Sequence, residues 1–116
     1  MTPVIVYVDD EPLLCKAFRL LFKHDAVEVV TFTAPESAVD FIRSRDVSVV
    51  VCDYRMPGLT GLEVLERIAK DVPFYIVTGD LGITRIASLR PGVTGVLAKP
   101  FAPSQLLELV RGHLAG

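Results

Sequence analysis

The sequence has few features of disulfide-rich, membrane or secreted proteins. It contains two cysteines, Cys15 and Cys52, both in apolar segments without CxxC spacing or a nearby histidine. Such cysteines are typically buried, reduced thiols, so we expect a cytoplasmic protein. The apolar runs at residues 4–8 and 49–52 are far shorter than the roughly 20 residues of a membrane-spanning helix. The N-terminus also lacks the basic start of a signal peptide, so we predict neither a membrane span nor secretion.

An excess of charge of one sign is also lacking. Twelve lysines and arginines against fourteen aspartates and glutamates give a formal net charge of −2, and the basic residues are scattered. Direct nucleic-acid binding needs a stripe of positive charge, so we predict no such partner. The 51% hydrophobic and 22% charged content fits one folded domain over residues 1–116. A chain of this length folds without needing a metal, so any bound metal would serve chemistry.

The hydrophobic pattern alternates regularly between two periods. β-branched apolar runs predict five strands, at residues 3–8, 27–32, 47–52, 74–77 and 93–98. Apolar residues at three- and four-residue intervals predict five helices, around residues 12–22, 34–45, 61–70, 83–89 and 104–114. The capping-box spacings Thr33–Glu36 and Thr60–Glu63 place the starts of the second and third helices.

This order of elements predicts the fold class. Continuous apolar strands that alternate with helices are typical of a parallel sheet covered on both faces. Right-handed crossovers leave few topologies, and we expect an α/β, flavodoxin-like, doubly wound five-stranded sheet of order 2-1-3-4-5. Ligands of such sheets bind at the carboxyl ends of the strands.

Polar residues stand at four of these predicted strand ends. Asp9 and Asp10 follow the first strand, Asp53 the third, Thr78 the fourth and Lys99 the fifth. In the order 2-1-3-4-5 the first and third strands are neighbours, so the three aspartates should lie within a few ångströms of one another.

Three clustered carboxylates predict a nearby cation, because like charges raise each other's pKa. Lys99 supplies one positive charge. Mg²⁺ suits the remainder, since it binds one or two carboxylates together with carbonyl, water and phosphoryl oxygens. The main-chain carbonyl of Arg55 is a further candidate ligand.

With these residues in place, the chain resembles the receiver domain of two-component response regulators, which includes the stand-alone chemotaxis regulator. The resemblance covers nearly all of the sequence. Its marks are four motifs in order: the acidic segment 8–12, the loop 53–58, Thr78, and Lys99-Pro100-Phe101. Each motif alone is weak, but their order at successive strand ends is specific.

The resemblance implies a phosphoacceptor that catalyses only its own phosphorylation and dephosphorylation. Asp53 would be the nucleophile that takes a phosphoryl group from a sensor histidine kinase or phosphotransfer protein. Asp9, Asp10, Asp53 and the Arg55 carbonyl would hold Mg²⁺, with Asp9 acting partly through water. Lys99 would offset charge on the phosphoryl oxygens.

The resemblance also implies a route to output. Thr78 would hydrogen-bond the phosphoryl group and draw the following loop inward, changing a surface that a downstream protein or fused output domain reads. The Lys99–Pro100 peptide bond would be cis. Whether phosphorylation causes dimerisation, and whether the regulator stands alone or forms part of a longer chain, is left open.

Two features depart from the family pattern or extend it. Val96 stands where many receivers have an aromatic residue that turns inward with the threonine, so output would depend on a backbone or helix shift instead. Arg55 and Asp80 should flank the mouth of the site, and we hypothesise that they pair across it and control access of water.

Two alternatives remain. A pseudo-receiver would keep the fold but signal by binding alone, against which the complete set of site residues argues. A phosphatase of the haloacid dehalogenase type combines similar residues with Mg²⁺. Its nucleophile, however, follows the first strand in a DxD pattern, whereas here that strand ends in Asp9-Asp10-Glu11 and no cap domain is present.

Overall fold

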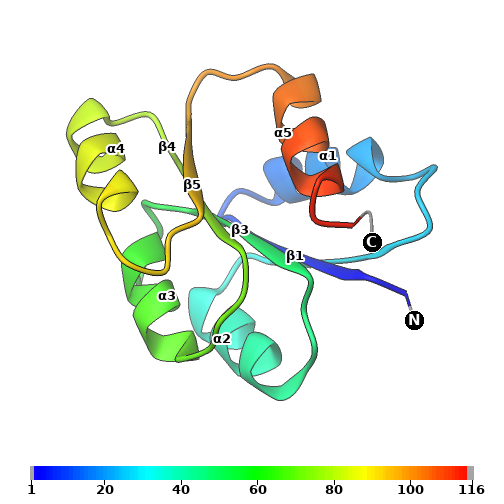
Figure 1. Ribbon diagram of the computed structural model, residues 1–116, viewed down its shortest axis with the longest axis horizontal. Helices are drawn as coiled ribbons and strands as arrows, with labels where there is room; N and C mark the ends of the chain where they lie inside the picture. Colours follow the sequence, from blue (N-terminus) through cyan, green and yellow to red (C-terminus); the bar gives the residue numbers. More distant parts are fainter. Residues whose placement is uncertain (1, 115–116) are drawn as a thin grey trace.

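A computed structural model describes residues 2–114 and shows a parallel sheet between two layers of helices (Figure 1). The predicted domain extends beyond this range by residue 1 and residues 115–116. The strands are Val4–Val8 (β1), Glu28–Phe32 (β2), Val49–Asp53 (β3), Phe74–Thr78 (β4) and Gly95–Ala98 (β5). The helices are Pro12–Leu21 (α1), Pro35–Ser44 (α2), Gly61–Ile68 (α3), Leu81–Ser88 (α4) and Pro103–Arg111 (α5).

The strand order is β2-β1-β3-β4-β5, with every neighbouring pair parallel. The predicted flavodoxin-like topology is therefore confirmed. Val8 pairs with Phe32 on β2 and with Cys52 on β3. This register brings the ends of β1 and β3 side by side, and with them the aspartates that follow or end these strands.

Helices cover both faces of the sheet, so the central strands are buried on both sides. Side chains alternate along a strand, and one set packs with α2, α3 and α4 while the other packs with α1 and α5. Every residue of β1, β3 and β4 is buried, which explains why these strands are continuous apolar runs in the sequence. Both cysteines lie in these cores, as expected.

The helix starts show where local chemistry refines the predicted boundaries. The capping box predicted at Thr33 is wrong: α2 begins at Pro35, Ala34 is its N-cap, and no side chain caps it. A residue that precedes proline avoids helical angles, and Ala34 is extended, so Pro35 becomes the first helical residue. The capping box at Thr60 is confirmed, because Thr60 Oγ1 accepts from the Glu63 N–H and Glu63 Oε1 accepts from the Thr60 N–H.

The fourth helix buries fewer side chains than the other four helices. Its only buried residue is Ala87, whereas Leu81, Ile86 and Leu89 at or beside this helix are exposed. It begins two residues before the predicted position, because Asp80 Oδ1 accepts hydrogen bonds from the N–H groups of Gly82 and Ile83. None of the described helices combines the length and hydrophobicity needed to cross a bilayer.

Candidate functional site

An open pocket of about 740 Å³ lies at the carboxyl ends of the strands. Its lining residues come from the last residues of β3 and β4, the loops that follow β1, β3, β4 and β5, and the start of α4: Asp10, Glu11, Asp53, Arg55, Thr78, Gly79, Asp80, Leu81, Gly82 and Lys99. Five of the six predicted site residues are in this lining. The sixth, Asp9, is fully buried.

The three predicted aspartates form one cluster. One carboxylate oxygen each from Asp9, Asp10 and Asp53 lies within 4.8 Å of the others. The neighbouring ends of β1 and β3 produce this cluster, as the strand order required. An all-oxygen, acidic donor set of this size has the chemistry that a hard divalent cation such as Mg²⁺ prefers. The residues present therefore fit the predicted metal.

Asp53 is the acceptor candidate at the centre of the cluster. Its side chain is 11% exposed, and Lys99 Nζ lies 3.3 Å from its Oδ1. Burial raises the pKa of Asp53, and the charges of Asp9 and Asp10 raise it further, while the Lys99 ammonium partly opposes both. The folded chain without a cation therefore disfavours the charged form of Asp53. The Lys99–Pro100 peptide bond is cis.

Asp9 has both of its carboxylate oxygens engaged within the protein. Oδ1 accepts from the Glu11 N–H at 3.0 Å, and Oδ2 accepts from the Tyr7 hydroxyl at 2.8 Å. Burial and the adjacent Asp9 carboxylate raise the pKa of Tyr7. This role of Tyr7 was not predicted, although side chains two positions apart along an extended chain, such as those of Tyr7 and Asp9, point to the same face of the sheet.

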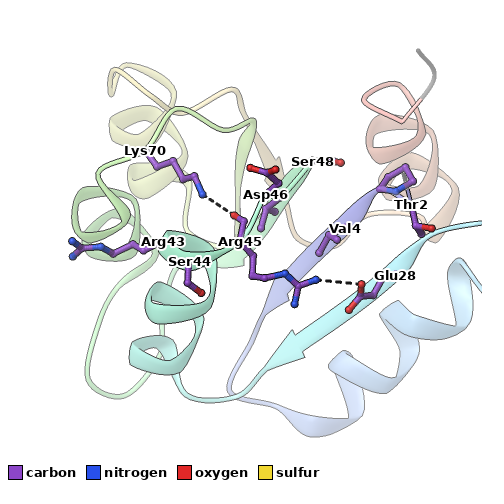
Figure 2. A pocket seen from close by; sticks show the side chains of 11 residues that line it. Thr2, Val4, Glu28, Arg43, Ser44, Arg45, Asp46, Ser48 and Lys70 are labelled. Atoms are coloured by element: carbon purple, nitrogen blue, oxygen red, sulfur yellow. Dashed lines mark hydrogen bonds and ion pairs between the residues drawn. The ribbon is translucent and has the colours of Figure 1, made fainter.

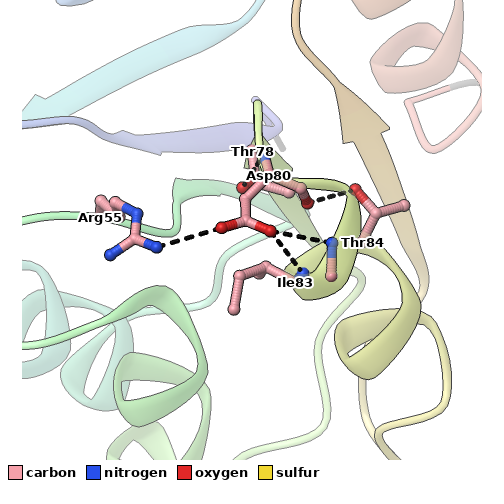
Figure 3. Close-up of polar contacts among 6 residues, drawn as sticks. Arg55, Thr78, Asp80, Ile83 and Thr84 are labelled. Atoms are coloured by element: carbon pink, nitrogen blue, oxygen red, sulfur yellow. Dashed lines mark hydrogen bonds and ion pairs between the residues drawn. The ribbon is translucent and has the colours of Figure 1, made fainter.

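Arg55 and Asp80 pair across the mouth of the pocket, as hypothesised (Figure 3). Arg55 Nη2 lies 3.2 Å from Asp80 Oδ2, while Asp80 Oδ1 caps α4. The cap bond from Ile83 and the bond from Arg55 lower the pKa of Asp80. The Asp80 main-chain N–H donates to Thr78 Oγ1 at 3.1 Å. The side chain of Thr78 is thus hydrogen-bonded directly to Asp80, the N-cap residue of α4.

Gly61 allows α3 to approach the end of β3 closely. An added Cβ would lie 2.8 Å from the main-chain oxygen of Asp53 and 2.8 Å from Ile76 Cδ1. The Gly61 N–H also donates to the Tyr54 carbonyl at 2.9 Å. The sequence showed this glycine only as part of a capping box, whereas its contact with Asp53 depends on the tertiary structure.

A second depression, of about 810 Å³, lies at the opposite, amino-terminal ends of the strands (Figure 2). Three of its charged side chains, those of Glu28, Arg45 and Lys70, are engaged with one another or with carbonyls. Arg45 lies 3.5 Å from Glu28, and Lys70 Nζ donates to the carbonyls of Ile42 and Arg45, both at 2.7 Å. These contacts hold the end of α2 and do not form a cluster comparable to the aspartates.

The fold and this site together define a flavodoxin-like domain with an acidic pocket at its topological switch point. Residues 5–111 match the response regulator receiver domain family, and the chain belongs to that family. The resemblance inferred from the four motifs is confirmed. The chain is therefore a receiver domain of two-component signalling systems, a family of signalling modules rather than classical enzymes.

Curated relatives and solved structures agree with this assignment. The chain is similar to the regulatory protein VanR of Enterococcus faecium, with 26% identity over 98% of the chain and 51% of VanR. It is 32% identical to the transcriptional regulatory protein FlgR of Helicobacter pylori over 91% of the chain and 28% of FlgR. It therefore spans about half or less of these relatives. The chemotaxis response regulator CheY4 of Vibrio cholerae has the same fold, with a TM-score of 0.84 at 22% identity, covering 97% of the chain and 99% of CheY4.

Proposed function

We propose that this receiver accepts a phosphoryl group on Asp53 from a sensor histidine kinase or phosphotransfer protein, and that the reaction depends on Mg²⁺. The observation that carries the proposal is the position of Asp53. Its carboxylate lines an open pocket, contacts Lys99 Nζ at 3.3 Å, and lies within 4.8 Å of oxygens from Asp9 and Asp10.

In the proposed reaction an oxygen of Asp53 attacks the phosphorus of a phosphohistidine. The P–N bond breaks, its electron pair stays on the imidazole nitrogen, and that nitrogen takes up a proton. A carboxylate is a weak nucleophile, so catalysis consists of positioning and neutralising charge. Mg²⁺ held by Asp9, Asp10, Asp53 and the Arg55 carbonyl would supply positive charge to the phosphoryl oxygens. The Lys99 ammonium supplies a second positive charge from the end of β5.

The proposed output begins at Thr78. Its hydroxyl accepts from the Asp80 N–H and retains its own hydrogen to donate to a phosphoryl oxygen. A rotation of Thr78 towards Asp53 would remove the acceptor of the Asp80 N–H and shift the start of α4. That helix has one buried side chain and exposes Leu81 and Ile86, so its surface can change at small cost and alter binding of a downstream protein or a fused output domain.

The experiment that tests the proposal is intact-mass measurement after incubation with Mg²⁺ and acetyl phosphate. We expect one added phosphoryl group on wild type, none on Asp53→Ala, and none when a chelator is present from the start. Lys99→Ala should slow the addition without preventing folding. Absence of added mass, together with absence of a beryllofluoride complex, would favour a pseudo-receiver that signals by binding alone.

A further inference from the structure

The Tyr7 hydroxyl donates a hydrogen bond to the carboxylate of Asp9, which is fully buried. Asp9 has no exposed surface, so each of its oxygens needs a donor from the protein. The Glu11 N–H supplies one, at 3.0 Å from Oδ1, and would be present with any residue at position 11 except proline. The second donor is a side chain, the Tyr7 hydroxyl, at 2.8 Å from Oδ2.

Packing fixes the Tyr7 ring and therefore the position of its hydroxyl. Tyr7 lies on β1 between β2 and β3, and its ring stacks on Phe18 of α1 with centroids 4.3 Å apart and planes 12° apart. Leu14, Phe101 and Tyr7 line the same groove between α1 and α5. A phenylalanine would make the same apolar contacts, so the hydroxyl contributes only the bond to Asp9.

We infer that Tyr7 is a positioning residue for the metal site: it fixes the orientation of the Asp9 carboxylate towards Asp10 and Asp53. The inference rests on the proposed Mg²⁺ dependence and names a determinant of that site. One hydrogen bond to each oxygen holds the Asp9 carboxylate in one orientation, and each oxygen keeps a second acceptor position for the cation or for a water bound to it. Asp10 and Asp53 line the pocket and are the carboxylates that a cation entering from solvent meets first.

Removing the hydroxyl should weaken Mg²⁺ binding. In Tyr7→Phe, Asp9 Oδ2 would face an apolar ring without a donor, and an unpaired buried oxygen is unfavourable. The Asp9 side chain would therefore leave its orientation. Partners that orient a metal-binding carboxylate typically change metal affinity by about 10-fold or more, so we expect the Mg²⁺ dissociation constant to rise about 10-fold.

Tyr75→Phe is the matched control. Tyr75 is also a buried tyrosine on the α1/α5 face of the sheet, but the hydrogen-bond partner of its hydroxyl is His113 and not an aspartate. Both variants lose one buried hydroxyl, and both should show a lower Tm. Only Tyr7→Phe should change Mg²⁺ affinity, measured by calorimetry on the unphosphorylated full chain.

A double-mutant cycle with Asp9→Asn tests whether Tyr7 acts through Asp9. We expect Tyr7→Phe to have no further effect on Mg²⁺ affinity in the Asp9→Asn background. Equal affinities of wild type and Tyr7→Phe would overturn the inference while leaving the proposed function in place, and so would tighter binding by Tyr7→Phe. Wild type that binds no Mg²⁺ would overturn both.

A second measurement does not depend on the folding of Tyr7→Phe. The chain has three tyrosines and no tryptophan, so the variant Tyr54→Phe/Tyr75→Phe leaves Tyr7 as its sole phenol. Mg²⁺ should then change the near-ultraviolet absorption of Tyr7 with the dissociation constant found by calorimetry. A flat signal during saturable Mg²⁺ binding would contradict the inference.

Discussion

Gly61→Ala should destabilise the protein, because α3 meets the end of β3 without room for a side chain. The added Cβ would lie 2.8 Å from the Asp53 carbonyl oxygen, about 0.6 Å short of the 3.4 Å at which ordinary contact begins. The Asp53 main chain is held in the sheet by its pairing with Val77. The helix would therefore have to retreat, against the packing of Val64 and Ile68, which are buried.

Overpacking of this kind costs about 1–3 kcal/mol. Two contacts at 2.8 Å, one of them with main chain, place the cost in the upper part of this range, about 2–3 kcal/mol. Replacing glycine by alanine in a helix returns about 1 kcal/mol at most, so we expect a net loss of about 1–2 kcal/mol in the free energy of unfolding. For a domain of this size that corresponds to a fall in Tm of about 4–10 °C. Urea denaturation followed by circular dichroism measures the free energy directly.

Gly112→Ala is the control for this substitution. Gly112 has φ −59° and ψ −24°, and a Cβ there would meet its nearest atom, the Leu109 carbonyl oxygen, at 3.4 Å. This variant should be as stable as wild type or slightly more stable. If Gly61→Ala were equally stable, the close approach of α3 to Asp53 would not be the reason for glycine at position 61.

Two further predictions concern the pocket. Because the folded state raises the pKa of Asp53, its charged form destabilises the cation-free protein at neutral pH, and the penalty disappears as pH falls below the ordinary aspartate value. Asp53→Asn should therefore have a higher Tm than wild type at pH 7 without Mg²⁺, and the difference in Tm should shrink as the pH falls towards 4. A difference that stays constant with pH would show that the charge of Asp53 is not its cause. If the Arg55–Asp80 pair restricts access of water, phosphorylated Arg55→Ala and Asp80→Asn should both lose the phosphoryl group several-fold faster than wild type, as followed by intact mass. Asparagine can still cap α4, so the faster loss in Asp80→Asn would come from the lost pair. Unchanged rates would refute this role of the pair.

The sheet could be predicted from the sequence because its buried strands are continuous apolar runs. Runs such as residues 4–8 and 49–52 are buried on both faces, and their strand-end residues follow from the order of the elements. Asp9, Asp10 and Asp53 could therefore be placed together before any side-chain contact was known.

Contacts that depend on side-chain reach could not be predicted in the same way. The Tyr7–Asp9 bond requires the ring to be held by Phe18, which is eleven residues from Tyr7 in the chain. The cap of α4 by Asp80 was missed because the apolar period of that short helix starts only at Ile83. At Thr33 the capping-box spacing was present, but the proline rule at Ala34 outweighed it.

Because residue 96 is a valine and not an aromatic residue, we expect the conformational switch to involve the start of α4. Val96 is half-buried and packs against the core on the α2/α3/α4 face. A valine has no ring to rotate inward with Thr78. A response to phosphorylation that begins at Thr78 would then pass through the main chain between Thr78 and α4.

Hydrogen exchange at that segment would measure the response. The N–H groups of Gly82 and Ile83 are held by Asp80 Oδ1, at 2.8 and 3.2 Å, and the Asp80 N–H is held by Thr78 Oγ1 at 3.1 Å. If Thr78 turns towards a phosphoryl group, these amides should exchange at a changed rate when beryllofluoride and Mg²⁺ are added to wild type. The same additions should leave Asp53→Ala unaffected. Unchanged exchange in wild type that binds beryllofluoride would mean that the signal leaves the site by another route than α4.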